Sequence, residues 1–182
     1  MNTPQVLLRA MEPDDIDLLY RWENDMSIWN VSNTLAPFSR HILQKYIETS
    51  HLDIYQTKQL RLMIDYYENN NEKRTVGMID LFDFDPYHNR AGVGILIGDD
   101  GDRGKGIAGM ALENLIYYSF STLKLHQLFC NIGISNKISI KLFEKHGFQC
   151  CGQKKHWLKV SSGYEDEYIF QLINNDQDGT EW

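Results

Sequence analysis

The sequence contains no apolar run that approaches the roughly 18 consecutive residues required of a membrane-spanning helix. Its first residues, MNTPQVLLRAMEPDD, lack the cationic region followed by an apolar stretch that marks a secretory signal. These absences exclude helical membrane spans and argue against export. We therefore expect a cytoplasmic protein without a membrane partner.

Cysteine is also scarce. The chain has three cysteines, an odd number, and two of them, Cys150 and Cys151, are adjacent and poorly placed for ordinary disulfide geometry. The third is Cys130. No C-x-x-C or H-x-x-x-H spacing offers the ligand pairs typical of a zinc site. We expect free thiols in a reducing compartment and no bound metal.

Positive charge is in deficit. The chain has 18 Lys and Arg against 25 Asp and Glu, which gives a net charge of -7. Such a protein repels a phosphate backbone unless its basic residues gather on one face, so we expect no nucleic-acid partner. The surplus of acids suits a cationic small molecule or peptide, but it is equally typical of a solvated, soluble surface.

A length of 182 residues suits one domain with a sizeable core and is too short for two full ones. The sequence has no internal repeat and no linker long enough to divide it. We therefore expect a single domain over residues 1–173, followed by a polar, frayed tail over 174–182.

The spacing of apolar residues predicts an ordered series of strands and helices. Period-two alternation from Gln59 to Asp85 around a polar turn predicts an antiparallel hairpin, and a 3.6-residue period after Gly106 predicts a helix. The alternating order predicts a mixed sheet with helices on its faces rather than a purely parallel one. Further strands are expected at 6–9, 91–98, 126–134, 148–160 and 164–173, and further helices after Pro13, after Ser39 and over 136–146.

A glycine-rich loop between a predicted strand and a predicted helix is the strongest local signal. It contains Arg103-Gly104-Lys105-Gly106-Ile107-Ala108. Glycines allow close approach of the backbone to a ligand, and a helix N-terminus offers N–H groups and a positive dipole end to an anion. The loop matches neither the P-loop nor the dinucleotide-binding pattern. It predicts a diphosphate site, with a plain surface turn as the alternative.

Further along, the chain carries N-x-x-S-x-x-L-F-E-K-x-G-F from Asn136 to Phe148. Together with R-x-x-G-x-A from Arg103 to Ala108, this pattern resembles the acetyl-CoA site of the GNAT N-acetyltransferase superfamily. Within the superfamily, the chain is most similar to bacterial spermidine N-acetyltransferases and ribosomal-protein N-terminal acetyltransferases. The resemblance runs from Val6 to Ile173.

The resemblance implies an α/β (α+β) fold of the GNAT type. We expect a mixed, mostly antiparallel, six- to seven-stranded sheet with helices on both faces and a splayed pair of central parallel strands. It also implies acetyl-CoA as co-substrate, with the diphosphate on the loop and the pantetheine arm along the preceding strand and the 136–146 helix. The residues so assigned to acetyl-CoA are Ile95, Leu96, Ile97, Arg103, Gly104, Lys105, Gly106, Ile107, Ala108, Asn136, Ser139 and Phe143.

The implied reaction is direct attack of a primary amine on acetyl-CoA in a ternary complex, without metal or covalent enzyme intermediate. Here the chain departs from its relatives. Phe143 stands where the spermidine enzymes have a Tyr that acts as general acid, and Gly92 stands where many members have a glutamate. The catalytic residue is therefore unknown, with Asp83 and Ser139 as weak candidates. A catalytically weak CoA-binding module is the alternative function, and a phosphate-binding protein with only local similarity is a third.

Four groups near the end of the predicted hairpin are candidate bases: Asp80, Asp83, Asp85 and His88. Period two predicts that Asp83 and Asp85 share the face of Leu81, whereas Asp80 shares the face of Phe82.

The amine acceptor is expected to bind between the segment 22–38 and the last hairpin around 164–166. Aromatic faces and acids there could hold a cation. The candidate substrate-binding residues are Trp29, Asn33 and Asp83. A polyamine, a small amine and a peptide N-terminus all stay open as acceptors, as does self-association into a homo-oligomer.

Overall fold

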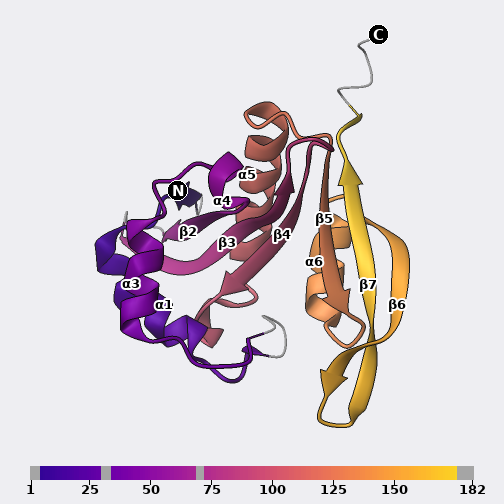
Figure 1. Cartoon of the computed structure of the whole chain (residues 1–182), viewed down its shortest axis with the longest axis horizontal. Helices are drawn as coiled ribbons and strands as arrows, with labels where there is room; N and C mark the ends of the chain where they lie inside the picture. Colours follow the sequence, from indigo (N-terminus) through magenta and orange to yellow (C-terminus); the bar gives the residue numbers. More distant parts are fainter. Residues whose placement is uncertain (1–4, 30–33, 69–71, 176–182) are drawn as a thin grey trace.

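The computed structural model describes residues 5–29, 34–68 and 72–175. In this part of the chain, seven strands form one sheet in the order β1-β2-β3-β4-β5-β7-β6 (Figure 1). Every neighbouring pair is antiparallel except β4 and β5, which are parallel and lie at the centre. The predicted mixed, mostly antiparallel sheet is therefore confirmed.

The elements follow the predicted order. The strands are β1 (Gln5–Arg9), β2 (Leu60–Tyr67), β3 (Lys73–Asp85), β4 (Arg90–Ile97), β5 (Gln127–Gly133), β6 (Gln149–Val160) and β7 (Gly163–Ile173). The helices are α1 (Ile16–Glu23), α3 (Arg40–Glu48), α4 (Ile54–Thr57), α5 (Ile107–Ser121) and α6 (Lys137–Lys145), with 3-10 turns η1 (Pro13–Asp15) and η2 (Asp100–Asp102). No helix in the described ranges is long and apolar enough to cross a membrane.

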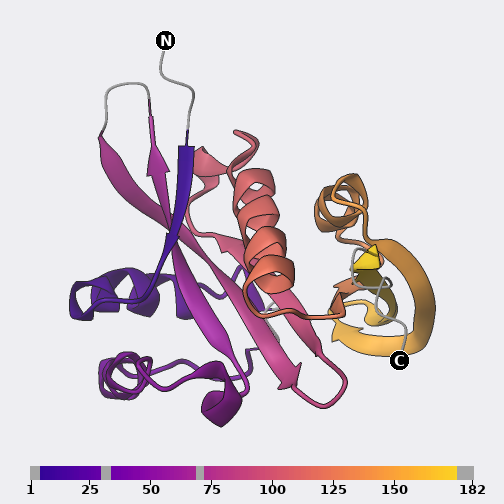
Figure 2. The same cartoon turned by 90° about the horizontal axis from the view of Figure 1, so that it is seen from above.

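Helices cover both faces of the sheet, as predicted. Seen from above, α5 and α6 lie on one face, and α1 and α3 lie on the other (Figure 2). Strand β3 serves both layers because its side chains alternate: Ile79 and Leu81 pack into the main core with α5, whereas Met78 packs with α1 and α3. The face toward α1 and α3 is called the second face below.

The two central strands separate after a short contact. Strands β4 and β5 pair only from Arg90–Gly92 to Gln127–Phe129. Beyond these pairs, β4 stays bonded to β3 as far as Ile97, and β5 stays bonded to β7 as far as Gly133. The expected splayed parallel pair is thus confirmed, and the diverging strands can be followed in Figure 1.

Strand β3 contains a bulge that the sequence pattern does not reveal. The register with β4 shifts between Phe82 and Asp85, and Asp83 adopts a left-handed φ of 48°. Phe84 lies in the main core with Leu81. The period-two prediction, which placed Asp83 and Asp85 on the face of Leu81, is therefore wrong beyond Phe82, because an extra residue reverses the alternation.

Two further details differ from the predicted boundaries. Helix α4, capped by the Asp53 side chain, is a single turn and too short to show a period. Asn174, in the predicted tail, is buried, and its backbone N–H donates to the carbonyl of His126 at 2.8 Å. Residues 176–182 of that tail lie outside the described residues.

Gly98 gives the first testable prediction. A Cβ at this position would overlap the indole of Trp22, which is almost completely buried between α1 and the sheet. We expect Gly98→Ala to lower the free energy of unfolding by about 1–3 kcal/mol, as overpacking does. Gly101→Ala is the control, because a Cβ there meets nothing within 4 Å, and it should change stability by less than about 0.5 kcal/mol. Urea unfolding measures both; equal effects would contradict the packing argument.

Candidate functional site

The loop between β4 and α5 ends in a helix start that no side chain caps. Helices α3, α4 and α6 each receive a cap from a side-chain oxygen, of Ser39, Asp53 and Asn136 respectively. The N-cap of α5 is Gly106, with a left-handed φ of 81° and no side chain. The first-turn N–H groups of a helix have no partner within it. This 15-residue helix therefore directs uncapped donors and a positive dipole end toward the loop.

The two cations of the loop are both engaged. The Arg103 guanidinium donates to the carbonyl of Ile97 at 3.3 Å and pairs with Asp100 at 2.5 Å. Lys105 pairs with Asp102 at 3.2 Å. Positive charge from Arg103 and Lys105 is thus largely balanced by acids of the same loop, so the backbone and the helix dipole carry the attraction for an anion.

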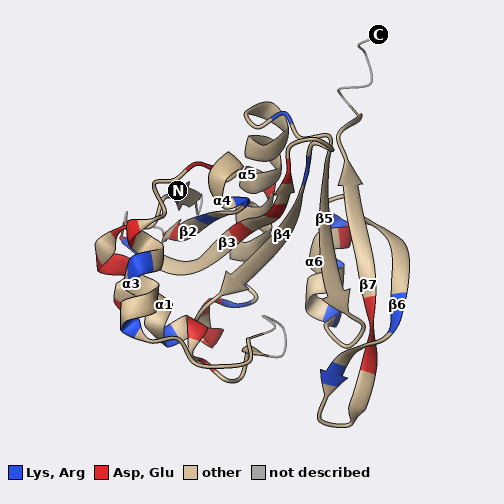
Figure 3. Cartoon of the chain, viewed as in Figure 1, with Lys and Arg blue, Asp and Glu red and all other residues tan. Residues whose placement is uncertain are grey.

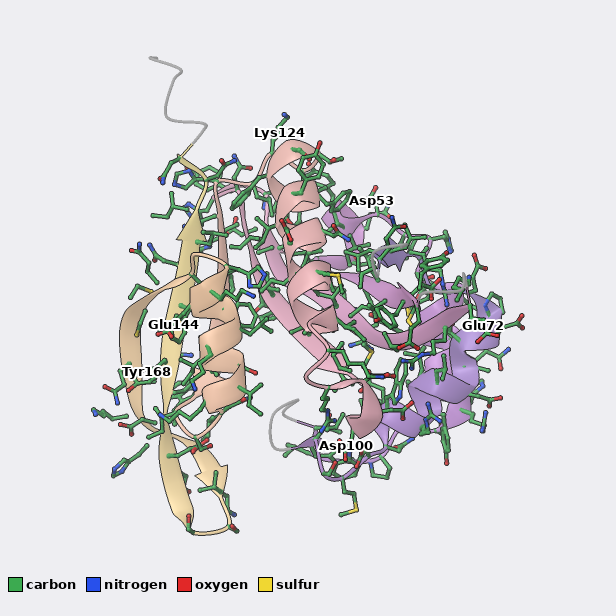
Figure 4. The ribbon with its side chains drawn as sticks, turned by 180° about the vertical axis from the view of Figure 1, so that it is seen from behind. Asp53, Glu72, Asp100, Lys124, Glu144 and Tyr168 are labelled. Atoms are coloured by element: carbon green, nitrogen blue, oxygen red, sulfur yellow. The ribbon has the colours of Figure 1, made fainter. Side chains whose placement is uncertain are left out.

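Asp102 ties this loop to the sheet. Its side chain is only 4% exposed, and both carboxylate oxygens accept hydrogen bonds from the guanidinium of Arg74 on β3. The hydrogen bonds from Arg74, followed by that from Lys105, outweigh burial and hold the pKa of Asp102 below its usual range. By contrast, Asp100 is 89% exposed at the outside of the loop (Figure 4). Arg74 is not among the residues predicted from the sequence, because nothing in its neighbourhood marks a partner 28 residues away.

Strand β4 supplies the residues before the loop. Ile95 and Ile97 pack toward the main core, whereas Leu96 packs on the second face with the apolar residues of α1 and α3. All three pair with β3, and the described pairing of β4 with β5 has already ended at Gly92. The edge of β4 that faces β5 is therefore where a ligand backbone could add hydrogen bonds.

Helix α6 holds the three residues of the downstream motif. The Oδ1 atom of Asn136 accepts the N–H of Ser139 at 3.1 Å, which caps the helix and leaves the side-chain NH2 as a donor. Ser139 is half-buried. Phe143 is 3% exposed and packs edge-to-face on Phe148, with ring centroids 5.0 Å apart. Phe143 is thus part of the core.

A charged cluster lies on the second face. Arg61 of β2 donates two hydrogen bonds of 2.8 Å to Asp80 of β3 and a third to Glu23 of α1. Burial disfavours the charged guanidinium, but Asp80 outweighs it, so the pKa of Arg61 is raised. Burial also raises the pKa of Tyr46, over whose ring Arg61 lies at 5.3 Å. Two carboxylates share one cation, and the cluster keeps one net negative charge.

The remaining candidate bases have other contacts. Asp83 is exposed in the bulge of β3. Asp85 accepts the backbone N–H groups of His88 and Tyr87, and the first of these chiefly lowers its pKa, so its carboxylate shapes the turn. His88 is exposed and packs edge-on against Tyr87. Asp80 is the one among the four whose side chain lies with Arg61 on the second face.

Of the three candidate acceptor-binding residues, Trp29 and Asp83 lie within the described residues. The Trp29 indole donates to the carbonyl of Glu23 at 3.0 Å, next to the charged cluster. Asn33 lies outside the described residues. On the last hairpin, acids of β7 pair with lysines of β6 (Figure 3), as Lys154 does with Glu167 at 2.8 Å.

All three cysteines are free, with Cys130 buried and Cys150 and Cys151 exposed. Within the described ranges, no three His, Cys, Asp or Glu side chains gather so that they could hold a metal ion.

Residues 5–149 match the family model described as "Acetyltransferase (GNAT) domain". The chain is 25% identical over 177 residues to the spermidine N(1)-acetyltransferase of Vibrio cholerae serotype O1, covering 94% of this chain and 95% of that protein.

Two solved structures share the fold. The spermidine N-acetyltransferase from Vibrio cholerae in complex with CoA and spermine aligns with a TM-score of 0.81 at 22% identity, over 93% of this chain and 95% of that one. The dodecameric structure of spermidine N-acetyltransferase from Vibrio cholerae in an intermediate state aligns with a TM-score of 0.76 at 23% identity, over 97% and 99%.

The contact between Asp102 and Arg74 predicts a pH dependence. Because the fold lowers the pKa of Asp102, its stabilising contribution is complete above the unfolded value of about 3.9 and disappears as the pH falls through the lower folded value. We expect Asp102→Asn to be less stable than the wild type at neutral pH, with a difference that shrinks below about pH 4. Thermal unfolding from neutral to acidic pH measures this difference, with the exposed Asp100→Asn as control. A difference that stays constant on acidification would contradict it.

Proposed function

This chain belongs to the GNAT acetyltransferase family as an acetyl-CoA-dependent N-acetyltransferase, and from that premise we propose that it acetylates a primary amine by direct attack in a ternary complex. The observation that carries the proposal is the uncapped N-terminus of α5 beside the splayed strands. The CoA diphosphate binds the N–H groups from Arg103 to Ala108, and Arg74 and Asp102 hold that loop in place.

The pantetheine arm adds to the edge of β4 at 95–97, where pairing with β5 has ended. The side-chain NH2 of Asn136 donates to the arm, and Ser139 and Phe143 line its inner end. A backbone N–H of β4 near Ile95 polarises the thioester carbonyl, as a fixed donor stabilises a developing oxyanion. These contacts use main-chain groups and uncharged side chains, so they do not depend on an ionisable side chain.

The acceptor approaches from the second face. The net negative charge of Glu23, Arg61 and Asp80 attracts an ammonium ion, which must lose a proton before it reacts because an alkylamine has a pKa near 10. The nitrogen lone pair then attacks the carbonyl carbon, and the nitrogen, now positively charged, gives up a second proton. The C–S bond breaks, the thiolate leaves with the electron pair, and uptake of a proton converts it to CoA thiol. Three side chains are candidates to carry these protons. Asp80 is held by Arg61, Ser139 offers a hydroxyl, and Asp83 is exposed in the bulge.

The relatives guide the choice of acceptor and assembly. The curated relative and both solved structures are named for spermidine, and one of the two structures is dodecameric. These names support a cationic primary amine as substrate and a homo-oligomer as the working form. A small amine and a peptide N-terminus share the same reacting group. Free thiols support the reducing cytoplasm as the compartment.

The proposal is tested by CoA release. The wild type should bind acetyl-CoA and release CoA thiol with at least one primary amine. Gly106→Val should lose both, because a β-branched residue is strained at a φ of 81°, and relief of that strain would move the N–H groups that begin α5. Gly101→Val, in the same loop, should retain both. Calorimetry and thiol detection measure the two properties, and thermal unfolding checks the fold. Binding without turnover would instead favour the CoA-binding module.

Substitution of Phe143 tests whether the departing thiolate needs a proton donor. Because position 143 carries no phenol, the wild-type rate should rise with pH as the amine deprotonates, without a descending alkaline limb. Phe143→Tyr should raise kcat by at least about tenfold, as a positioned acid does, and introduce an alkaline limb near pH 10, the ordinary pKa of tyrosine. Phe148→Tyr, which adds the same hydroxyl to the neighbouring ring, should do neither. An unchanged rate for Phe143→Tyr would point to another proton source.

A further inference from the structure

An aromatic pair marks the point where the central strands separate. Gly92 of β4 pairs with Phe82 of β3 on one side and with Phe129 of β5 on the other. Directly paired residues share a face of the sheet, so the two aromatic rings flank a position without a side chain. Their centroids are 5.8 Å apart in an edge-to-face arrangement. Both residues are half-buried, so part of each side chain is exposed as apolar surface.

The ring of Phe82 occupies the space above Gly92. A Cβ on Gly92 would overlap that ring, and a Cβ on Gly94 would lie 3.8 Å from it. The surface next to the last β4–β5 pair is therefore aromatic, and a charged side chain at position 92 would need Phe82 to move.

This aromatic surface adjoins the charged cluster. Asp80 pairs across the sheet with Gly94, two residues along β4 from Gly92, and Met78, Asp80 and Phe82 alternate onto the second face. Asp80 and Glu23 together retain one negative charge after pairing with Arg61. One ammonium ion is thus matched by charge, and the surface beside it is apolar.

Resting on the proposed function, we propose that the acceptor is a monoamine with an apolar, preferably aromatic, substituent, which packs on Phe82 and Phe129 while its nitrogen faces Asp80. A second ammonium group on this surface would lose hydration without gaining a counter-charge. Two other acids toward this face, Glu165 and Glu167, lie beside Gly133, four residues along β5 from Phe129 and on the arm that diverges from β4. Glu167 is already paired with Lys154 at 2.8 Å.

The experiment compares four amines as acceptors for the full-length wild type, with kcat/KM measured by CoA release. The amines are 2-phenylethylamine, n-butylamine, 1,4-diaminobutane and spermidine. Comparison of 2-phenylethylamine with n-butylamine measures the effect of the aromatic substituent. Comparison of n-butylamine with 1,4-diaminobutane measures the effect of a second positive charge. We expect 2-phenylethylamine to exceed n-butylamine roughly two- to tenfold, the range of an aromatic contact, and n-butylamine to exceed both polyamines.

Three variants test whether the preference for an aromatic amine depends on the ring of Phe82. Phe82→Ala should reduce the ratio of 2-phenylethylamine to n-butylamine to about one. Phe82→Leu should also reduce it while it keeps most of the apolar volume, which separates loss of the ring from loss of the fold. Tyr87→Ala is the matched control, because Tyr87 is an aromatic residue of the adjacent turn with 87% exposure, and it should leave the ratio unchanged.

The outcomes distinguish this inference from its premise. Turnover with 1,4-diaminobutane or spermidine preferred over both monoamines overturns the monoamine assignment and leaves the proposed function standing. A ring preference that survives Phe82→Leu overturns the role of Phe82. Acetyl-CoA binding with no turnover of any amine overturns the proposed function, and this inference with it.

Discussion

The separation of β4 from β5 after Gly92 and Phe129 is the constraint on which the rest of the structure depends. Each strand keeps its partner on the outer side, so the sheet stays intact while two inner edges lose their hydrogen bonds. Unpaired backbone groups are costly when buried and become binding groups when a ligand supplies the partner. The helices that follow these strands, α5 and α6, then begin beside the opening.

Electrostatics in the loop follow from this use of backbone groups. Arg103 and Lys105 are balanced by Asp100 and Asp102, so neither acts as an isolated cation. Arg74 adds the charge that makes burial of Asp102 tolerable, and it fastens the loop to β3. A fixed loop directs its N–H groups before the anion arrives, which reduces the ordering cost of binding. Acids within the loop are therefore consistent with the proposed diphosphate site, because they set geometry rather than net charge.

The sequence predicts those parts of the fold that repeat along the chain and misses those that depend on distant pairing. Alternation located the β2–β3 hairpin, and the glycine-rich loop located the start of α5. One extra residue at Asp83 then reversed the faces, since a bulge leaves no mark in period-two counting. The contacts of Arg61 with Asp80 and of Arg74 with Asp102 span 19 and 28 residues. Only the register of β2, β3 and the loop brings them together.

Two aromatic residues stand where polar side chains could have assisted the reaction. Phe143 lies in the core of α6, and Phe82 covers Gly92 on the opposite face. At the proposed thioester position, both would reduce the number of ionisable groups and lower the local polarity, which would strengthen the fixed backbone donors of β4. A thiolate is a tolerable leaving group, and a deprotonated alkylamine is a good nucleophile. The proposed site thus favours orientation and carbonyl polarisation over proton transfer, and in our proposal the choice of acceptor rests on the surface that the rings of Phe82 and Phe129 leave beside Asp80.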